Sequence, residues 1–279
     1  MYILFDIGGT KMRLAVSENL QKISEPKILE TPQSYEEGIA IFKKTAESLV
    51  NGEKIEAIAG GIAGPFDEKK RSLVHSPNLK DWVGKPFKQE LEKTFAAPVF
   101  IENDTAMVGL GEAHFGAGRG YKIVAYLTLS TGVGGCRIVD GKIDEKTIGF
   151  EPGHQIIDAG KTLCPECDGN YLGQYISGKA IFKRTGKKPE EIDDPDFWRR
   201  IAVFLAYGLN NTIVHWSPEV VLLGGSLMNK IDIAVVAEEL AKILKIFPEM
   251  PALKKAELAD IGGLWGAMVF LRQELGLAP

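Results

Sequence analysis

The sequence predicts an α/β protein built from two related lobes around a cleft. Short apolar segments with period-two alternation, typical of strands, alternate along the chain with longer segments whose apolar residues recur at helical spacing. In addition, each half begins with a strand, a glycine-rich turn and a second strand, with the turns at residues 8–10 and 130–135. This weak internal repeat predicts lobes of similar construction.

The composition is that of an ordinary folded protein. The chain has 279 residues, of which 45% are hydrophobic and 25% charged, and these fractions exclude wholesale disorder. It carries 33 basic and 37 acidic residues, a formal net charge of −4, and no cluster of Lys or Arg stands out. This balance disfavours nucleic acid as a partner.

The sequence also predicts neither a membrane span nor a secretion signal. The longest apolar stretches, such as residues 220–223 and 231–236, are far too short to span a bilayer. Met1 leads directly into an apolar strand, without a basic region or a small-residue cleavage site. Three cysteines, an odd number, argue against a disulfide scaffold. We therefore expect a soluble cytoplasmic protein.

In the first half, the apolar run at residues 2–7 stops at Gly8-Gly9, and period-two alternation predicts a second strand around residues 12–16. A third strand is expected within residues 22–29. Ser34 is expected to begin a helix that ends at Asn51-Gly52, because apolar residues between them fall on one helical face. Beyond it, the pattern predicts strands at 55–62 and 98–101 and helices at 87–95 and 106–114.

The second half begins with a strand at 123–129, and residues 133–139 are expected to pair back through Asp140-Gly141, a favoured hairpin turn. After an irregular stretch, apolar spacing and strand-like runs predict further elements. These are helices near 175–184 and at 197–216, a buried strand at 220–223, and helices at 231–244 and 264–275.

The two glycine turns are the first chemical signal. Glycines between strands let backbone amides approach an anion closely, and Thr10 adds a hydroxyl donor. A carboxylate at Asp6 would suit such a site if Mg²⁺ lay between it and a phosphate. Taken alone, the first turn is also compatible with a plain hairpin in which Asp6 forms the turn. The second turn, with Thr131 and Gly132, repeats the pattern and favours a clamped polyphosphate.

Polar residues also follow the strand at 98–101. Asn103 or Asp104 would cap the next helix, which is the commoner role for such residues. A carboxylate at a junction between a strand and a helix is also where a general base reaches a bound hydroxyl. Both roles remain open from the residues alone.

A third cluster combines Glu151 and His154 with a pair of cysteines, Cys164 and Cys167. Cysteines at this spacing, with a histidine nearby, form half of a zinc site. Because no second pair follows, two reduced surface thiols are an equal alternative.

Several motifs together resemble the ROK family (repressor, open reading frame, kinase), whose enzymes are ATP-dependent sugar kinases. They are Asp6-Ile7-Gly8-Gly9-Thr10-Lys11, Gly61-Ile62-Ala63-Gly64-Pro65-Phe66-Asp67, Ser76-Pro77-Asn78-Leu79-Lys80-Asp81-Trp82, Glu102-Asn103-Asp104, Thr131-Gly132-Val133-Gly134-Gly135, Glu151-Pro152-Gly153-His154, Ser177-Gly178 and Leu223-Gly224-Gly225. Any one motif is weak, but their order and spacing are highly specific.

The resemblance implies a ribonuclease H-like/actin-like ATPase fold of the hexokinase type, with two α/β lobes and an interlobe cleft. The lobes would comprise residues 1–112 and 113–263, with a hinge near residues 109–120. The last helix, about 264–279, would pack back on the first lobe. A homodimer is also implied.

The resemblance further implies roles for individual residues. Asp104 would be the catalytic base that takes the proton from a sugar hydroxyl, with the 6-hydroxyl of glucose as the first expectation. The sugar pocket would comprise Gly64, Asn78, Asn103, Glu151 and His154. Asp6 would hold Mg²⁺ through water. The nucleotide would be bound by Gly8, Gly9, Thr10, Lys11, Thr131, Gly132, Gly224 and Gly225.

The chain departs from the family pattern at the zinc motif. The third cysteine position is Tyr171, and the position of a sugar-binding glutamate is Gly173, when both are counted from Ser177-Gly178. This puts in doubt a structural zinc held by His154, Cys164 and Cys167. It also removes one contact to the sugar, for which Gln174 or Glu166 are the candidate replacements.

Three functions follow as expectations. The first is an ATP:hexose kinase acting on glucose or on an N-acetylated hexosamine such as N-acetylmannosamine, with polyphosphate as an alternative donor. The second is a sugar-sensing repressor, which the start of the phosphate motif at Asp6 disfavours because it leaves no room for a helix-turn-helix. The third is a sugar-binding protein without catalysis, suggested by Gly173.

Overall fold

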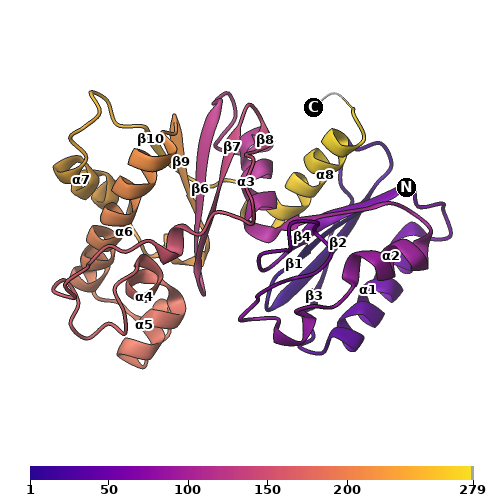
Figure 1. Ribbon diagram of the computed structural model, residues 1–279, viewed down its shortest axis with the longest axis horizontal. Coiled ribbons are helices and arrows are strands. Elements are labelled where there is room, and N and C mark those ends of the chain that lie inside the picture. Colours follow the sequence, from indigo (N-terminus) through magenta and orange to yellow (C-terminus); the bar gives the residue numbers. More distant parts are fainter. Residues whose placement is uncertain (278–279) are drawn as a thin grey trace. The chain divides into compact units, whose positions relative to one another are not determined.

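The computed structural model describes residues 1–277, which divide into two compact units. Unit 1 comprises residues 1–115, 145–149 and those from Asp260 onward, and unit 2 comprises residues 116–144 and 150–259. In each unit a mixed β-sheet packs against α-helices (Figure 1).

The sheet of unit 1 has the strand order β3-β2-β1-β4-β5. Its strands are β1 (Tyr2–Ile7), β2 (Lys11–Ser17), β3 (Lys27–Glu30), β4 (Ala57–Ile62) and β5 (Val99–Asn103). β1 is antiparallel to β2 and parallel to β4, and β4 is parallel to β5. Because alternate side chains of a strand point to opposite faces, Asp6 lies on the face opposite to Phe5 and Ile7.

Helices α1 (Tyr35–Val50) and α2 (Phe87–Phe95) pack on the face that Phe5 occupies (Figure 1). Phe5, Phe42 and Phe87 meet edge to face, with ring centroids 5.4–5.7 Å apart. As predicted, Ser34 caps the start of α1 by accepting from an amide of its first turn, and Asn51 ends it in the left-handed conformation.

Helices α3 (Asp104–Phe115) and α8 (Gly262–Glu274) pack together and against β4 on the other face. Glycines bring their backbones unusually close. A Cβ on Gly266 would lie 1.7 Å from the carbonyl oxygen of Met107, and one on Gly111 would lie 2.4 Å from that of Gly262. Since this contact leaves no room for side chains, it fixes α8 against α3.

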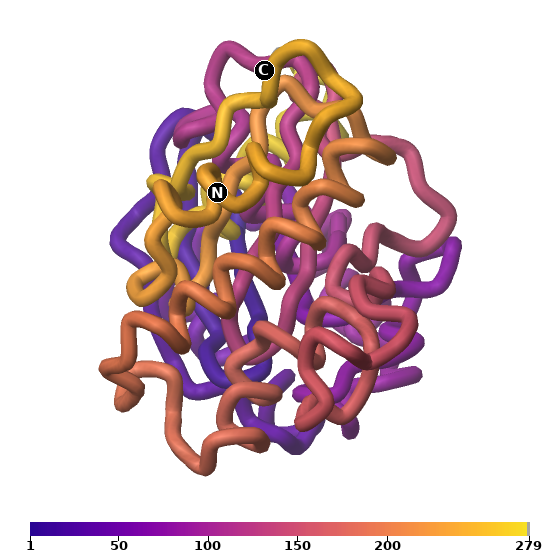
Figure 2. The backbone as a smooth tube through the Cα atoms, turned by 90° about the vertical axis from the view of Figure 1, so that its left-hand side faces the viewer, coloured from indigo at the N-terminus to yellow at the C-terminus, as the bar shows by residue number. Residues whose placement is uncertain are grey.

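The sheet of unit 2 has the order β10-β9-β6-β7-β8. Its strands are β6 (Ile123–Leu129), β7 (Val133–Val139), β8 (Lys142–Ile143), β9 (Val220–Gly224) and β10 (Ala252–Lys255). Its helices are α4 (Leu172–Ile176), α5 (Gly178–Thr185), α6 (Pro195–Trp216) and α7 (Ile233–Ile243). Figure 2 shows α6 as the long orange helix of this unit, and its buried residues form one core with α4, α5 and α7.

Three details of the sequence prediction differ from the structure. The turn at residues 130–132 joins β6 to β7, whereas Asp140-Gly141 joins β7 to the short β8. The helix near 175–184 is broken into α4 and α5 at Ser177, whose hydroxyl accepts from the Ala180 amide and caps α5. β10 was not predicted, because it is a partly exposed edge strand with little alternation.

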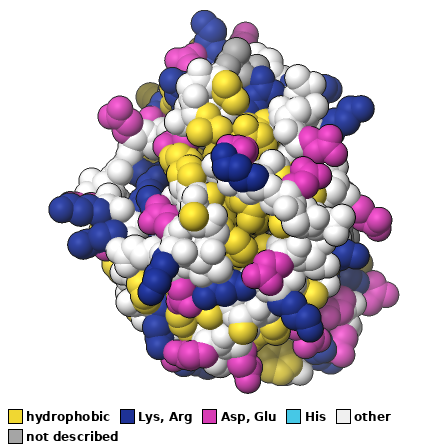
Figure 3. All heavy atoms as spheres, turned by 90° about the vertical axis from the view of Figure 1, so that its right-hand side faces the viewer, with side chains coloured by type: hydrophobic (Ala, Val, Ile, Leu, Met, Phe, Trp, Pro, Cys, Tyr) yellow, Lys and Arg dark blue, Asp and Glu magenta, His cyan; other side chains and the backbone are white. Residues whose placement is uncertain are grey.

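Charges of both signs cover the surface. On the face shown in Figure 3, Lys and Arg side chains are interspersed with Asp and Glu around patches of hydrophobic side chains. Among residues 1–277, each helix is too short or too polar to cross a bilayer.

Candidate functional site

The predicted base lies at the junction of β5 and α3. Asn103 ends the strand and Asp104 begins the helix. The side-chain oxygen of Asn103 accepts from the Ala106 amide at 3.1 Å, so Asn103 caps α3. One carboxylate oxygen of Asp104 accepts from the following amide, that of Thr105, at 2.8 Å. Asn103, rather than Asp104, therefore caps α3.

Glycines allow the backbone to pass close to this junction. A Cβ on Gly61 would lie 2.7 Å from the Cα of Asp104. Gly64 has φ +135°, and a Cβ there would lie 2.4 Å from the carbonyl oxygen of His75. The Gly64 carbonyl accepts from the side-chain amide of Asn103 at 3.2 Å. The structure thus brings Gly64, Asn103 and Asp104 together.

The first glycine turn lies beside Asn78, another residue that is predicted to bind the sugar. A Cβ on Gly9 would lie 2.4 Å from that of Asn78, so only glycine fits there. Within the turn, the Gly8 amide donates to the carbonyl of Lys11 at 2.9 Å. The carbonyl of Thr10 accepts from Thr31, and that of Gly9 accepts from Gln33. The backbone of this turn is therefore held in place on several sides.

Asp6 lies at the end of β1 and is 7% exposed. Its carboxylate accepts from Arg13 at 3.0 Å, and Arg13 also lies 3.4 Å from Asp260. Burial, followed by the negative charge of Asp104, raises the pKa of Asp6 to about 7, against the opposing effect of Arg13. A buried carboxylate near a second carboxylate fits a residue that takes part in binding a divalent cation.

In unit 2, the second turn is joined to the start of α5. The Gly178 amide donates to the carbonyl of Ser130 at 2.8 Å, and the Lys179 amide donates to that of Thr131 at 3.2 Å. A Cβ on Gly132 would meet no other atom within 4 Å, so the space beside this glycine is open. Open space beside a glycine turn suits a ligand that contacts the backbone.

The remaining predicted glycines of unit 2 pack against β6 and β7, the strands that this turn joins. The 151–154 segment packs on β7, since a Cβ on Gly153 would lie 2.2 Å from the carbonyl oxygen of Val133. Gly225, which follows β9, has φ +90° and approaches the backbone of Leu129. A Cβ on Gly224, the last residue of β9, would lie 2.4 Å from the hydroxyl of Tyr126. Glu151 itself is exposed.

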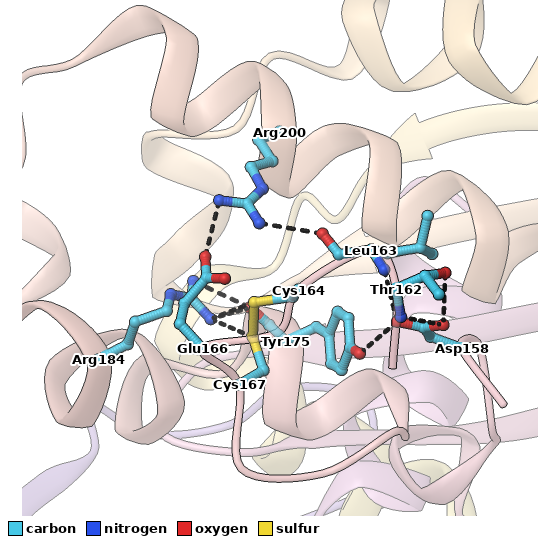
Figure 4. Close-up of a disulfide and its surroundings, with 9 residues drawn as sticks. All are labelled: Asp158, Thr162, Leu163, Cys164, Glu166, Cys167, Tyr175, Arg184 and Arg200. Atoms are coloured by element: carbon cyan, nitrogen blue, oxygen red, sulfur yellow. Dashed lines mark hydrogen bonds and ion pairs between the residues drawn. A yellow bond between two sulfur atoms is a disulfide. The ribbon is translucent and has the colours of Figure 1, made fainter. Parts of the chain in front are cut away.

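The expected zinc site is not supported. Cys164 and Cys167 are joined in a disulfide, so they offer no thiolates to a metal (Figure 4). The guanidinium of Arg184 donates to the sulfur of Cys167 at 2.9 Å, which places a cation where a metal would bind. His154 stacks on Tyr171, with ring centroids 4.9 Å apart. Within residues 1–277, no three His, Cys, Asp or Glu side chains are grouped to hold a metal.

The alternative of two reduced surface thiols is also wrong. Cys164 and Cys167 are 0% and 4% exposed, and they belong to the core of unit 2. Nearby, Asp158 accepts from the hydroxyl of Tyr175 at 2.8 Å (Figure 4). Burial and that bond raise the pKa of Tyr175 to about 12.

Glu166 and Gln174 are the candidate replacements for the glutamate that is missing at Gly173. Both side chains are held by other contacts. The carboxylate of Glu166 lies 2.8 Å from the guanidinium of Arg200, beside the disulfide (Figure 4). The side chain of Gln174 packs directly over Gly169, and its oxygen is buried without a hydrogen-bond partner.

Sequence reasoning missed several residues around the predicted base and Asp6. These are Arg13, Lys70, Lys146, Asp260 and Gly263. A Cβ on Gly263 would lie 2.8 Å from the carboxylate carbon of Asp6. Only Arg13 had a signal in the sequence, because an antiparallel hairpin through the first turn pairs it with Asp6. The others come from distant segments.

Comparison with known proteins gives consistent results. The chain is 27% identical to a glucokinase of Thermotoga maritima, covering 97% of both chains. It is 29% identical to an N-acetyl-D-glucosamine kinase of Mannheimia succiniciproducens, covering 94% of this chain and 96% of the relative.

Solved structures share the fold. A ROK hexokinase from Thermus thermophilus superposes with a TM-score of 0.85 at 26% identity, covering 99% of both chains. A ROK family glucokinase from Streptomyces griseus, in complex with glucose and AMPPNP, superposes with a TM-score of 0.80 at 27% identity, covering 98% of this chain and 99% of the other. The predicted hexokinase-type α/β fold is thereby confirmed. Since the ROK family model matches residues 2–274, the chain belongs to the ROK family.

Proposed function

We propose that this protein is an ATP-dependent sugar kinase that transfers the γ-phosphoryl group to a sugar hydroxyl, with the 6-hydroxyl of glucose as the first candidate. The observation that carries the proposal is the position of Asp104. It begins α3 beside Gly61, next to the helix cap Asn103, and close enough to Asp6 for its charge to raise the pKa of that carboxyl. A carboxylate at such a junction is suited to accept a proton from a hydroxyl.

In this proposal the sugar hydroxyl gives its proton to Asp104 as its oxygen bonds to the γ-phosphorus, and ADP leaves. Asn103 would orient a neighbouring hydroxyl, because its side chain is held by both Gly64 and Ala106. The other sugar contacts would come from Gly64, Asn78, Glu151 and His154. Positioning of this kind supplies much of the catalysis in phosphoryl transfer.

The nucleotide phosphates would be bound by backbone amides of the glycine turns. The residues would be Gly8, Gly9, Thr10 and Lys11 of the first turn and Thr131 and Gly132 of the second, with Gly224 and Gly225 towards the adenosine. Asp6 would hold Mg²⁺ through water, which fits its buried carboxylate and the nearby charge of Asp104. The ion would neutralise charge on the transferred group.

A second candidate substrate is an N-acetylated hexosamine. The observation that favours it is Gly173, where a carboxylate is missing and the side chain of Gln174 is turned onto Gly169. The relative from Mannheimia, named an N-acetyl-D-glucosamine kinase, is as similar to this chain as the glucokinase from Thermotoga.

A panel assay tests the proposal. Purified protein with ATP and Mg²⁺ would be given glucose, mannose, fructose, N-acetylglucosamine and N-acetylmannosamine in turn, and ADP release would be measured by a coupled assay. Polyphosphate would replace ATP in a parallel series. We expect ADP release with at least one hexose. Folded protein that releases no ADP with any sugar would refute the proposal, and calorimetric sugar binding without turnover would indicate a non-catalytic sugar-binding protein.

A further inference from the structure

The proposed mechanism assigns no role to Glu102, although its side chain is buried and it lies two residues before Asp104. It lies on β5 and is 3% exposed. In the parallel register of the sheet it pairs with Gly61, the glycine that lies against Asp104. A buried carboxylate is retained only where partners offset the loss of its hydration.

Three donors offset that loss. One oxygen of Glu102 accepts from the ammonium groups of Lys70 at 2.8 Å and Lys146 at 2.9 Å. The other oxygen accepts from the backbone amide of Asn103 at 2.8 Å. Burial raises the pKa of Glu102, but Lys146, Lys70 and the amide together hold it below its ordinary value. The carboxylate is therefore ionised at neutral pH.

The donors come from segments that lead to the proposed sugar site. Lys70 belongs to the 66–73 hairpin, which begins just after Gly64 and is closed by a bridge between Phe66 and Leu73. Lys146 lies in the 145–149 segment of unit 1, shortly before Glu151 in the chain. Asn103 itself holds the Gly64 carbonyl and caps α3. One carboxylate thus fixes these segments to the end of β5.

We propose that Glu102 is a positioning residue for the phosphoryl-transfer reaction, which, with Lys146 and Lys70, fixes the β5–α3 junction so that Asp104 meets the sugar hydroxyl in the reactive geometry. This inference rests on the proposed function. The hydrogen bond from the Asn103 amide to Glu102 connects this carboxylate to Asp104. A shift of that amide would move Asn103, which caps α3, and with it Asp104. A small misplacement of a reacting group is enough to slow a reaction strongly.

The test compares two carboxylates of unit 1 that accept similar bonds, the buried Glu102 and the partly buried Glu90. E102Q keeps a side-chain oxygen to accept from Asn103 but removes the charge that holds the lysines. E90Q is the matched control, because Glu90 accepts from Lys43 at 2.9 Å and from the Tyr35 hydroxyl at 2.7 Å, and joins α2 to α1. We expect E102Q to lower kcat by about 10- to 100-fold, with the KM for ATP within about 2-fold of wild type. E90Q should leave kcat within about 2-fold for a similar change in Tm.

Variants of the two lysines separate their contributions to kcat. They also provide a test if E102Q fails to fold. K146M and K70M each leave Glu102 with the other lysine, so these variants keep one ion pair at the junction. We expect K146M to lower kcat more than K70M, since Lys146 is 12% exposed and Lys70 is 40% exposed. K146R, which keeps the charge, should restore kcat to within about 3-fold of wild type.

Hydrogen exchange gives a readout that does not depend on activity. In E102Q the amides of residues 103–107 should exchange faster, whereas in E90Q they should exchange as in wild type. E102Q with wild-type kcat and wild-type exchange would overturn the proposal, as would a loss of kcat that E90Q shares in proportion to its loss of Tm. If wild-type protein phosphorylates no sugar, the proposed function fails, and exchange alone then decides whether Glu102 fixes the junction.

Discussion

Arg13 lies directly opposite Asp6 on the neighbouring strand, and its guanidinium donates to the carboxylate at 3.0 Å. Its other terminal nitrogen lies 3.4 Å from Asp260, at the start of the segment that leads into α8. Arg13 thereby joins the first hairpin to the segment that immediately precedes α8. The arrangement also explains how an aspartate that is almost fully buried is tolerated beside a second carboxylate, Asp104.

The free energy of unfolding should depend on pH through the ionisation of Asp6. Burial and Asp104 raise its pKa from 3.8 to about 7, although Arg13 opposes them. Between these values the native carboxyl is protonated while that of the unfolded chain is ionised, so the native state binds more protons. The contribution of Asp6 to the free energy of unfolding therefore falls as the pH rises from about 4 through 7.

The measurement is urea denaturation of wild type and D6N at several pH values between 4.5 and 7.5. The advantage of wild type over D6N should be largest at the acid end and decrease as the pH rises. E90Q serves as a control of opposite sign, because Tyr35 and Lys43 hold the pKa of Glu90 below its ordinary value despite its partial burial. A difference between wild type and D6N that does not vary with pH would contradict the assignment.

Asp104 should be needed for turnover rather than for folding. We expect D104A to lower kcat by about 10²–10⁴-fold, the range for a positioned general base. Its Tm should stay near that of wild type, because Asn103 and not Asp104 caps α3. Coupled ADP-release kinetics and a thermal melt of the same sample provide the check. Near-normal turnover by folded D104A would reject the role of base.

Much of the fold could be predicted because its signals are local. The helix at Phe87–Phe95 and the strands Ile123–Leu129 and Val133–Val139 have the predicted bounds, since their apolar spacing depends only on neighbouring residues. The edge strand Ala252–Lys255 was missed because it pairs with a single neighbour, β9, and alternates little.

The surroundings of the candidate site could not be predicted in the same way. Lys146 and Glu102 are 44 residues apart in the chain, and no local pattern connects them. The spacing of Cys164 and Cys167 indicated half a zinc site or two reduced thiols. Their disulfide was missed, because spacing alone does not show what lies against the sulfurs. The position of Arg184 beside them is decided by the packing of α5.

The close approach of β4 to Asp104 should make Gly61 intolerant of any side chain. In G61A the new Cβ would lie 2.7 Å from the Cα of Asp104, and backbone cannot move aside as a flexible side chain would. We expect a loss of about 1–3 kcal/mol in the free energy of unfolding, together with a lower kcat because the start of α3 is displaced.

A matched control separates this effect from the addition of a methyl group. A Cβ on Gly149, also in unit 1, would meet no other atom within 4 Å. G149A should therefore change both the free energy of unfolding and kcat only slightly. Equal effects of the two substitutions in urea denaturation and coupled kinetics would show that the contact with Asp104 is unimportant.

The disulfide should make only a small contribution to stability. Cys164 and Cys167 are three residues apart, so reduction frees only a very short loop. The chain-entropy relation gives about 2 kcal/mol for a loop of this size, which is near the low end for disulfides. We expect a phosphine reductant to lower the free energy of unfolding by about that amount, and the C164S/C167S double variant to lose its response to the reductant. C136S should keep the response, because Cys136 lies outside the disulfide.

We also expect the reduced protein to retain little zinc. With two sulfurs and the guanidinium of Arg184 beside them, the reduced pair lacks the four ligands of a structural zinc and is opposed by a nearby positive charge. Metal analysis of the reduced protein, after incubation with zinc and dialysis, should find far less than one zinc per chain. R184M serves as the comparison, since it removes the opposing charge and leaves the cysteines in place. One zinc retained per wild-type chain would show that Arg184 moves aside for a metal.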